Sequence, residues 1–205
     1  MKKLIIICLV VLVVLFATYP VQATITGVAL GTAPPPSTLG PYTMTAFDPD
    51  PQPRYSYVTS VASPLGGTVD FSTPLEHLVI GDGWSTWSHG YTGDVYVTWD
   101  LNVVTLTMPS GTGAFDLYAE PNPFATYLIT ATAQDGTSVS QEVYGMGGAC
   151  GYGFWADGGD QISTIEVDYF GINGFAVGEF GIAVPEPATI CLLGLGALSL
   201  IRRKK

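Results

Sequence analysis

Between its two ends the chain consists of short apolar runs that alternate with period two, and this pattern constrains the fold more than any other feature. Residues 115–120 and residues 165–169 both alternate in this way, and Phe115, Leu117 and Ala119 are the apolar members of the first run. Successive side chains of a β-strand point to opposite faces, so such a run predicts a strand with one buried face.

A hairpin is the most local of the predicted elements. Ile129, Ala131 and Ala133 alternate with threonines up to Asp135-Gly136, and residues 138–144 follow. An Asp-Gly turn supplies the positive φ that a tight hairpin needs. Strands are expected about every ten residues, and neither a sustained helical period nor a repeat interrupts them. Residues 55–183 are therefore predicted to be an all-β domain, an antiparallel, jelly-roll-like β-sandwich.

Residues 24–54 differ from this domain in their proline content. Three prolines occupy 34–36, and prolines alternate with other residues over 49–53. Such a density of proline favours extended backbone, so we predict a loosely packed arm that leads into the sandwich.

The N-terminal end reads as an export signal. Lys2 and Lys3 precede the apolar run 4–16, and residues 21–23 end in a small residue, Ala23. This order is typical of a secretory signal peptide, and the run is short for a membrane span of about 20 residues. We predict a signal peptide over residues 1–23 that signal peptidase removes.

The C-terminal end contains three parts in a fixed order. Two prolines, which cannot continue a strand or a helix interior, come before the uncharged run 188–201, which we expect to enter the membrane as a helix. A basic cluster then resists translocation and stays cytoplasmic, which places the domain outside. The first part is Val184, Pro185, Glu186 and Pro187, and the stop-transfer cluster is Arg202, Arg203, Lys204 and Lys205.

These residues resemble the PEP-CTERM sorting signal of bacteria that make extracellular polysaccharide. The resemblance covers residues 184–205 and implies cleavage by an exosortase, a membrane transpeptidase, so that the anchor is transient. Residues 104–122, 135–137, 147–154 and 174–182 also resemble a sandwich domain that recurs in exported PEP-CTERM proteins. That resemblance implies a fold and a location and carries no catalytic residues.

Charge excludes one class of partner. Sixteen carboxylates stand between residues 24 and 183 against a single basic residue, Arg54. Nucleic-acid affinity comes from neutralising phosphates with Lys and Arg, so nucleic-acid binding is excluded. Of three cysteines only Cys150 belongs to the domain, so neither an internal disulfide nor a cysteine zinc site can form there, and we assign Cys150 no role.

No residue pattern names a reaction. His77 and His89 are the two imidazoles, and neither has a spacing typical of a catalytic motif. We therefore predict no enzyme, no catalytic residues and no metal ligands. Structural calcium stays open, because loops at 48–50, 81–83 and 157–160 carry hard oxygen ligands, although Asp-Gly pairs are also ordinary turn residues.

Trp84 and Trp87 are the candidate binding residues. Both lie in a Gly/Ser-rich segment, whereas Tyr96 and Trp99 lie on or beside a strand. Flat rings in a loop suit stacking on a sugar, and buried packing is the alternative. We predict a non-enzymatic cell-surface or extracellular-matrix protein. The alternative is a carbohydrate-binding module for the producer's exopolysaccharide.

Overall fold

The structure is a computed structural model that describes residues 24–157 and 159–185. The predicted signal peptide and the predicted membrane helix both lie outside these residues. Within the described ranges there is no helix of the length and apolarity that a membrane crossing needs.

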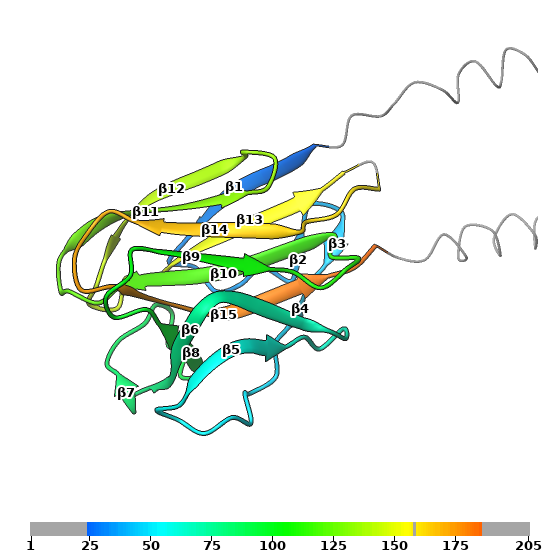
Figure 1. The fold of residues 1–205 in the computed structure, drawn as a ribbon. Helices are drawn as coiled ribbons and strands as arrows, with labels where there is room; N and C mark the ends of the chain where they lie inside the picture. Colours follow the sequence, from blue (N-terminus) through cyan, green and yellow to red (C-terminus); the bar gives the residue numbers. More distant parts are fainter. Residues whose placement is uncertain (1–23, 158, 186–205) are drawn as a thin grey trace, which may run out of the picture.

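The described residues form β-strands joined by turns (Figure 1). The long strands alternate with short ones that belong to loops and edges. Their bounds are β1 Ile25–Gly31, β2 Thr38–Leu39, β3 Tyr42–Thr43, β4 Thr45–Ala46, β5 Tyr57–Ala62, β6 Thr68–Ile80, β7 Gly83–Trp84, β8 Asp94–Val97, β9 Val103–Thr107, β10 Ala114–Pro121, β11 Thr126–Ala133, β12 Ser138–Tyr144, β13 Cys150–Ala156, β14 Thr164–Tyr169 and β15 Phe175–Ala183.

Apart from β2 and β3, which pair only with each other, the strands make one continuous sheet that folds over into two layers. Its order is β1-β13-β10-β15-β8-β6-β9-β14-β11-β12, and every neighbouring pair on this path is antiparallel. The layer β1-β13-β10-β15 faces the layer β9-β14-β11-β12, and β8 and β6 join the two (Figure 1). The prediction of an all-β, antiparallel sandwich is confirmed.

One large apolar cluster fills the space between the layers. It includes Phe115 and Leu117 of β10, Phe154 of β13 and Ile165 and Val167 of β14, all of them 0% exposed. Fully burying one such side chain stabilises the folded state by about 1.5–3 kcal/mol. Burial in this core therefore explains how the domain is stable without a disulfide. Cys150 is free and buried, and it belongs to this cluster.

The local predictions from alternation agree with the strands. β11 pairs with β12 around Gly136, whose φ is +90°, as expected of the Asp-Gly hairpin. In β14 the residues Ile165, Val167 and Tyr169 are buried and Glu166 is exposed. These elements depend on neighbours along the chain, which is why the pattern predicts them.

β10 departs from the prediction of one buried face, because all eight of its residues are buried. Phe115, Leu117 and Ala119 face the core as expected. Asp116 and Glu120 lie on the other face and are also 0% exposed. Two segments from distant parts of the sequence cover that face, the proline-rich segment and the segment that contains Trp84 and Trp87. The alternation within β10 contains no information about them.

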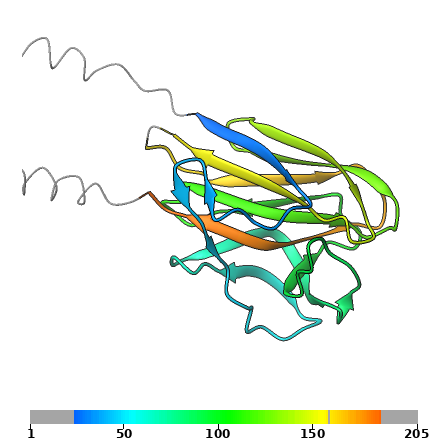
Figure 2. The same cartoon turned by 180° about the vertical axis from the view of Figure 1, so that it is seen from behind.

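The proline-rich segment is one of the two covers, and its structure differs from the loosely packed arm that we expected. Residues 25–31 are strand β1, paired with β13. Residues 32–54, which we call the covering segment, then cross the outer face of the β10 layer with the short strands β2, β3 and β4 (Figure 2). Phe47 N donates to Phe180 O at 3.0 Å, and Leu39 is buried. Prolines fit there because this backbone needs few ladder hydrogen bonds.

Candidate functional site

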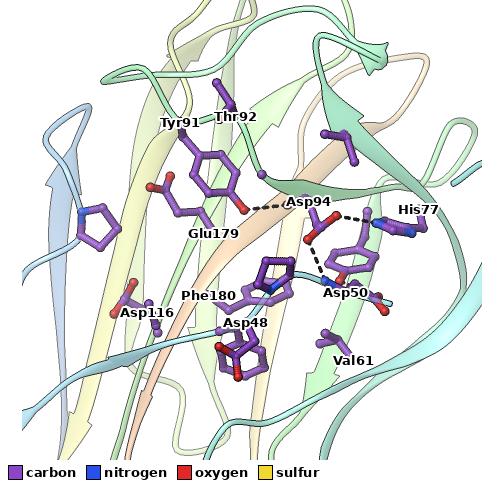
Figure 3. Close-up of a pocket in the computed structure, with 18 of the residues that line it drawn as sticks. Asp48, Asp50, Val61, His77, Tyr91, Thr92, Asp94, Asp116, Glu179 and Phe180 are labelled. Atoms are coloured by element: carbon purple, nitrogen blue, oxygen red, sulfur yellow. Dashed lines mark hydrogen bonds and ion pairs between the residues drawn. The ribbon is translucent and has the colours of Figure 1, made fainter. Parts of the chain in front are cut away.

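A cavity of about 820 Å³ lies between the covering segment and the sheet face beneath it (Figure 3). This volume is within the range of about 300–1,000 Å³ that small-molecule sites occupy. Its walls come from the covering segment, from β6, β8, β10 and β15, and from the loop before β8. The residues used below are Phe47, Asp48, Asp50, His77, Tyr91, Asp94, Tyr96, Asp116, Glu179 and Phe180.

One wall of the cavity is a chain of hydrogen bonds. His77 Nε2 lies 2.7 Å from Oδ1 of Asp94, and the backbone N of Asp50 donates to Oδ2 of the same carboxylate at 2.9 Å. Tyr96 donates its hydroxyl to Asp50 Oδ2 at 2.9 Å, and its ring stacks on His77. Desolvation, with a smaller contribution from Asp50, raises the pKa of Tyr96 well above its usual value, so the phenol stays a donor. The covering segment is thereby fixed to β6 and β8.

The opposite wall contains Glu179, which lies at an irregular position of β15 (Figure 3). Its φ is +51°, in the left-handed region, where the ladder with β10 shifts register. Bulges of this kind redirect a side chain. Here the carboxylate accepts from Trp87 Nε1 at 2.9 Å and lies 2.7 Å from His89 Nε2. Desolvation raises the pKa of Glu179, and these two partners oppose that rise.

Glu120 has a complete set of partners outside this cavity. Its carboxylate accepts from Trp84 Nε1 at 2.9 Å, from Thr86 Oγ1 at 3.1 Å and from the backbone N of Gly147 at 2.8 Å. Burial raises the pKa of Glu120, and these hydrogen bonds oppose that rise only in part. A buried carboxylate with this many donors ties the loops to β10, so we assign Glu120 a structural role.

Trp84 and Trp87, the sugar-binding candidates from the sequence, are 6% and 7% exposed. Each indole N–H is used on an internal carboxylate, Glu120 for Trp84 and Glu179 for Trp87. A ring that is this buried presents little surface on which a sugar can stack. Both tryptophans are therefore packed against internal carboxylates, the packing alternative noted above, and of the two carboxylates only Glu179 lines the cavity.

Asp116 is the exceptional group of the cavity wall. It is 0% exposed, and neither carboxylate oxygen has a hydrogen-bond partner among the residues that the structure describes. Desolvation, with a smaller contribution from the charge of Glu179, raises the pKa of Asp116 to about 7. Buried carboxylates normally have partners, so a carboxyl group left without one in a cavity wall is typical of a functional position.

Among the residues that the structure describes, the oxygen-rich loops do not converge on a metal site. Asp82 pairs instead with Arg54 and Tyr55, and Asp50 with Tyr96. No group of three or more His, Cys, Asp or Glu residues within 24–157 and 159–185 is arranged to hold a metal ion. Structural calcium therefore stays an untested prediction.

Sequence reasoning did not identify Asp116, Glu179, Asp94 and His77 as members of one site. The feature of the sequence that could have indicated this site is the presence of glycines on the strands that neighbour its carboxylates. Gly181 pairs with Asp116, and a Cβ on Gly181 would lie 2.4 Å from Asp116 Oδ2. That Gly181 leaves room for the Asp116 carboxylate can be recognised only once the pairing register of β10 and β15 is known.

Comparison with known proteins adds one firm result and one weak likeness. The curated proteins include no match to this chain. One solved structure, the enzymatically active domain of tailspike protein 4 of bacteriophage CBA120, aligns at 13% identity over 80% of this chain and 20% of that chain, and its TM-score of 0.24 carries no argument. Residues 183–205 match the family model of the PEP-CTERM protein-sorting motif. The C-terminal segment is therefore a PEP-CTERM sorting signal, which implies an exported, cell-envelope-associated protein and processing by an exosortase.

Proposed function

We propose that this chain is a non-enzymatic protein of the cell surface or extracellular matrix, delivered by its sorting signal and released from its anchor by exosortase. The observation that carries the proposal is the position of the motif. β15 ends at Ala183, and the matched segment begins at the same residue. The fold is therefore complete before the sorting signal starts.

The residues at this junction favour cleavage without unfolding. Gly113 N donates to the Ala183 carbonyl at 2.8 Å, and Val184, the next residue, is 42% exposed. Pro185 has no N–H and restricts the residue before it, so the backbone cannot continue the β15 ladder. A protease can reach an extended segment of this kind while the sandwich stays intact.

Intact mass spectrometry of protein from the native host tests this proposal. We expect a chain that starts at Thr24 and ends within or next to the segment from Val184 to Pro187. A Pro185→Ala, Pro187→Ala variant should keep its C-terminal segment, and a Pro123→Ala variant, changed in a loop of the domain, should be processed normally. Mature protein that still carries Arg202 to Lys205 in a host with active exosortase would contradict the proposal.

A second candidate function is binding of the producer's exopolysaccharide, now at the cavity rather than at Trp84 and Trp87. Its support is the lining, which combines carboxylates with the rings of Phe47, Tyr91 and Phe180. Carboxylates accept hydrogen bonds from sugar hydroxyls, and rings offer an apolar face. Such a mixed lining is typical of a ligand pocket.

A blocking substitution tests the cavity without disturbing the core. Thr92 lines the cavity and is exposed, so Thr92→Trp should fill the entrance and abolish oligosaccharide binding on a glycan array. Thr107→Trp is the matched control, because Thr107 is exposed on β9 of the other layer. Equal binding by both variants would remove the cavity as a carbohydrate site.

A further inference from the structure

The buried carboxylates of β10 and β15 differ in one respect that points to a ligand. Glu120 accepts from Trp84, Thr86 and two backbone N–H groups, and Glu179 is bound by Trp87 and His89. Asp116 lies on the far side of Glu179 from Glu120 along the sheet and is bound by no described residue. A buried polar group without a partner costs about 1–3 kcal/mol, and more when it is charged. A donor from outside the chain would remove that cost.

The surroundings of Asp116 keep room for such a donor. On one side β10 pairs Asp116 with Gly181, and on the other side with Gly153. A Cβ on Gly181 would lie 2.4 Å from Oδ2, so this glycine keeps the space beside the carboxylate open, whereas the Leu39 side chain already fills the space over Gly153. Two glycines thus flank the carboxylate in the sheet, and the third neighbour is the cavity.

The charge of the cavity selects the kind of donor. Five carboxylates line it, at Asp48, Asp50, Asp94, Asp116 and Glu179, and its single arginine, Arg54, is paired with Asp82 outside. Acidic sugars would be repelled by this lining, whereas a cation would be attracted. The described residues offer no cluster of metal ligands, so an organic cation fits better than a metal ion.

The apolar part of the lining indicates what the cation is attached to. Phe47 and Phe180 pack edge to face with centroids 5.6 Å apart, and Tyr96 stacks on Phe180 at 5.8 Å. Aromatic rings favour both a neighbouring ammonium and the carbon face of a sugar ring. A cavity of about 820 Å³ holds one or two sugar units rather than a bare ion.

We propose that the cavity binds a saccharide that carries a free, protonated primary amine, and that this ammonium group pairs with Asp116. This inference rests on the carbohydrate-binding candidate function above and names its ligand class. The ammonium has three donors, so it satisfies Asp116 and retains donors for Glu179 or Asp48. Asp116 is 0% exposed although it lines the cavity, so binding requires the side chains around it to shift.

Calorimetry with the exported, processed protein tests the inference. The probes are a glucosamine tetramer with free amines and the N-acetylated tetramer of the same linkage. We expect the free amine form to bind at least tenfold more tightly, and Asp116→Asn to lose most of that difference. Glu166→Gln is the charge control, because Glu166 is exposed on β14 in the other layer and should leave binding unchanged. Thermal melts of both variants confirm that they are folded.

Each of the other outcomes tests a different part of the proposal. Equal affinities for the two tetramers, blocked by Thr92→Trp, would overturn the amine preference and leave carbohydrate binding in place. Equal losses in Asp116→Asn and Glu166→Gln would show attraction to the acidic surface alone and overturn the role of Asp116. Spermidine binding as tightly as the free-amine tetramer would overturn the saccharide part. Failure of every glycan on an array would remove the candidate function itself.

Discussion

Asp116 makes the stability of the domain depend on pH in a direction that one substitution can isolate. In the folded state the pKa of Asp116 is about 7, against an ordinary value of 3.8, mainly because the carboxyl group is desolvated. The folded state therefore holds a proton that the unfolded chain has released. The stability contributed by this proton is fully present below pH 3.8 and is lost as the pH rises through 7.

The size of the effect follows from the same difference. Each pKa unit corresponds to about 1.4 kcal/mol, so ionisation of Asp116 costs up to about 4 kcal/mol of folding free energy at pH 8. Asp116→Asn keeps the shape and stays neutral. We expect the variant and the parent to be equally stable at pH 4, and the variant to be more stable by up to about 4 kcal/mol at pH 8.

Urea unfolding at pH 4, 6 and 8 measures this difference. Glu166→Gln, an exposed carboxylate on the other layer, is the control and should change stability by less than about 0.5 kcal/mol at every pH. A difference between Asp116→Asn and the parent that stays constant from pH 4 to pH 8 would refute the reasoning, because it would mean that Asp116 is ionised in the folded state throughout or is solvated.

Three further substitutions and one titration test the fold. Leu117→Ala should cost about 2–5 kcal/mol in urea unfolding, because Leu117 is fully buried between the layers. Gly174→Ala should lower the melting temperature, since φ is +68° and the new Cβ would lie 2.4 Å from Trp99 O; an unchanged melt would show that this turn can relax. Tyr118→Phe removes the 2.6 Å hydrogen bond to Ala33 O, so hydrogen exchange of the covering segment should speed up while the core stays protected. If calcium is structural, millimolar Ca²⁺ should raise the melting temperature, and an unchanged melt would remove calcium.

The sequence predicted the elements whose partners are close along the chain. The hairpin of β11 and β12 needs only its own alternation and one Asp-Gly turn. The class of fold follows from many such elements without a helical period. The end of the domain at Ala183 was also predictable, because the prolines that follow cannot join a strand.

The candidate site was not predictable in the same way, because it depends on contacts between distant segments. His77 meets Asp94 and Glu179 meets His89, and the last pair is 90 residues apart in sequence. Trp84 and Trp87 have the composition of an exposed loop, yet the carboxylates that bury them come from β10 and β15. Local composition cannot distinguish a ring that faces solvent from one that is bound to a distant acid.

The two ends of the described domain lie at the same end of the sandwich (Figures 1 and 2). A domain with this arrangement can be held by both its ends to one flat surface without being stretched between them. During export the domain can therefore fold while the predicted signal peptide and the predicted membrane helix are still attached. The opposite end, where the β10–β11, β12–β13 and β14–β15 connections expose Phe124, Met146 and Ile172, would then be the part of the molecule that extends farthest from the cell.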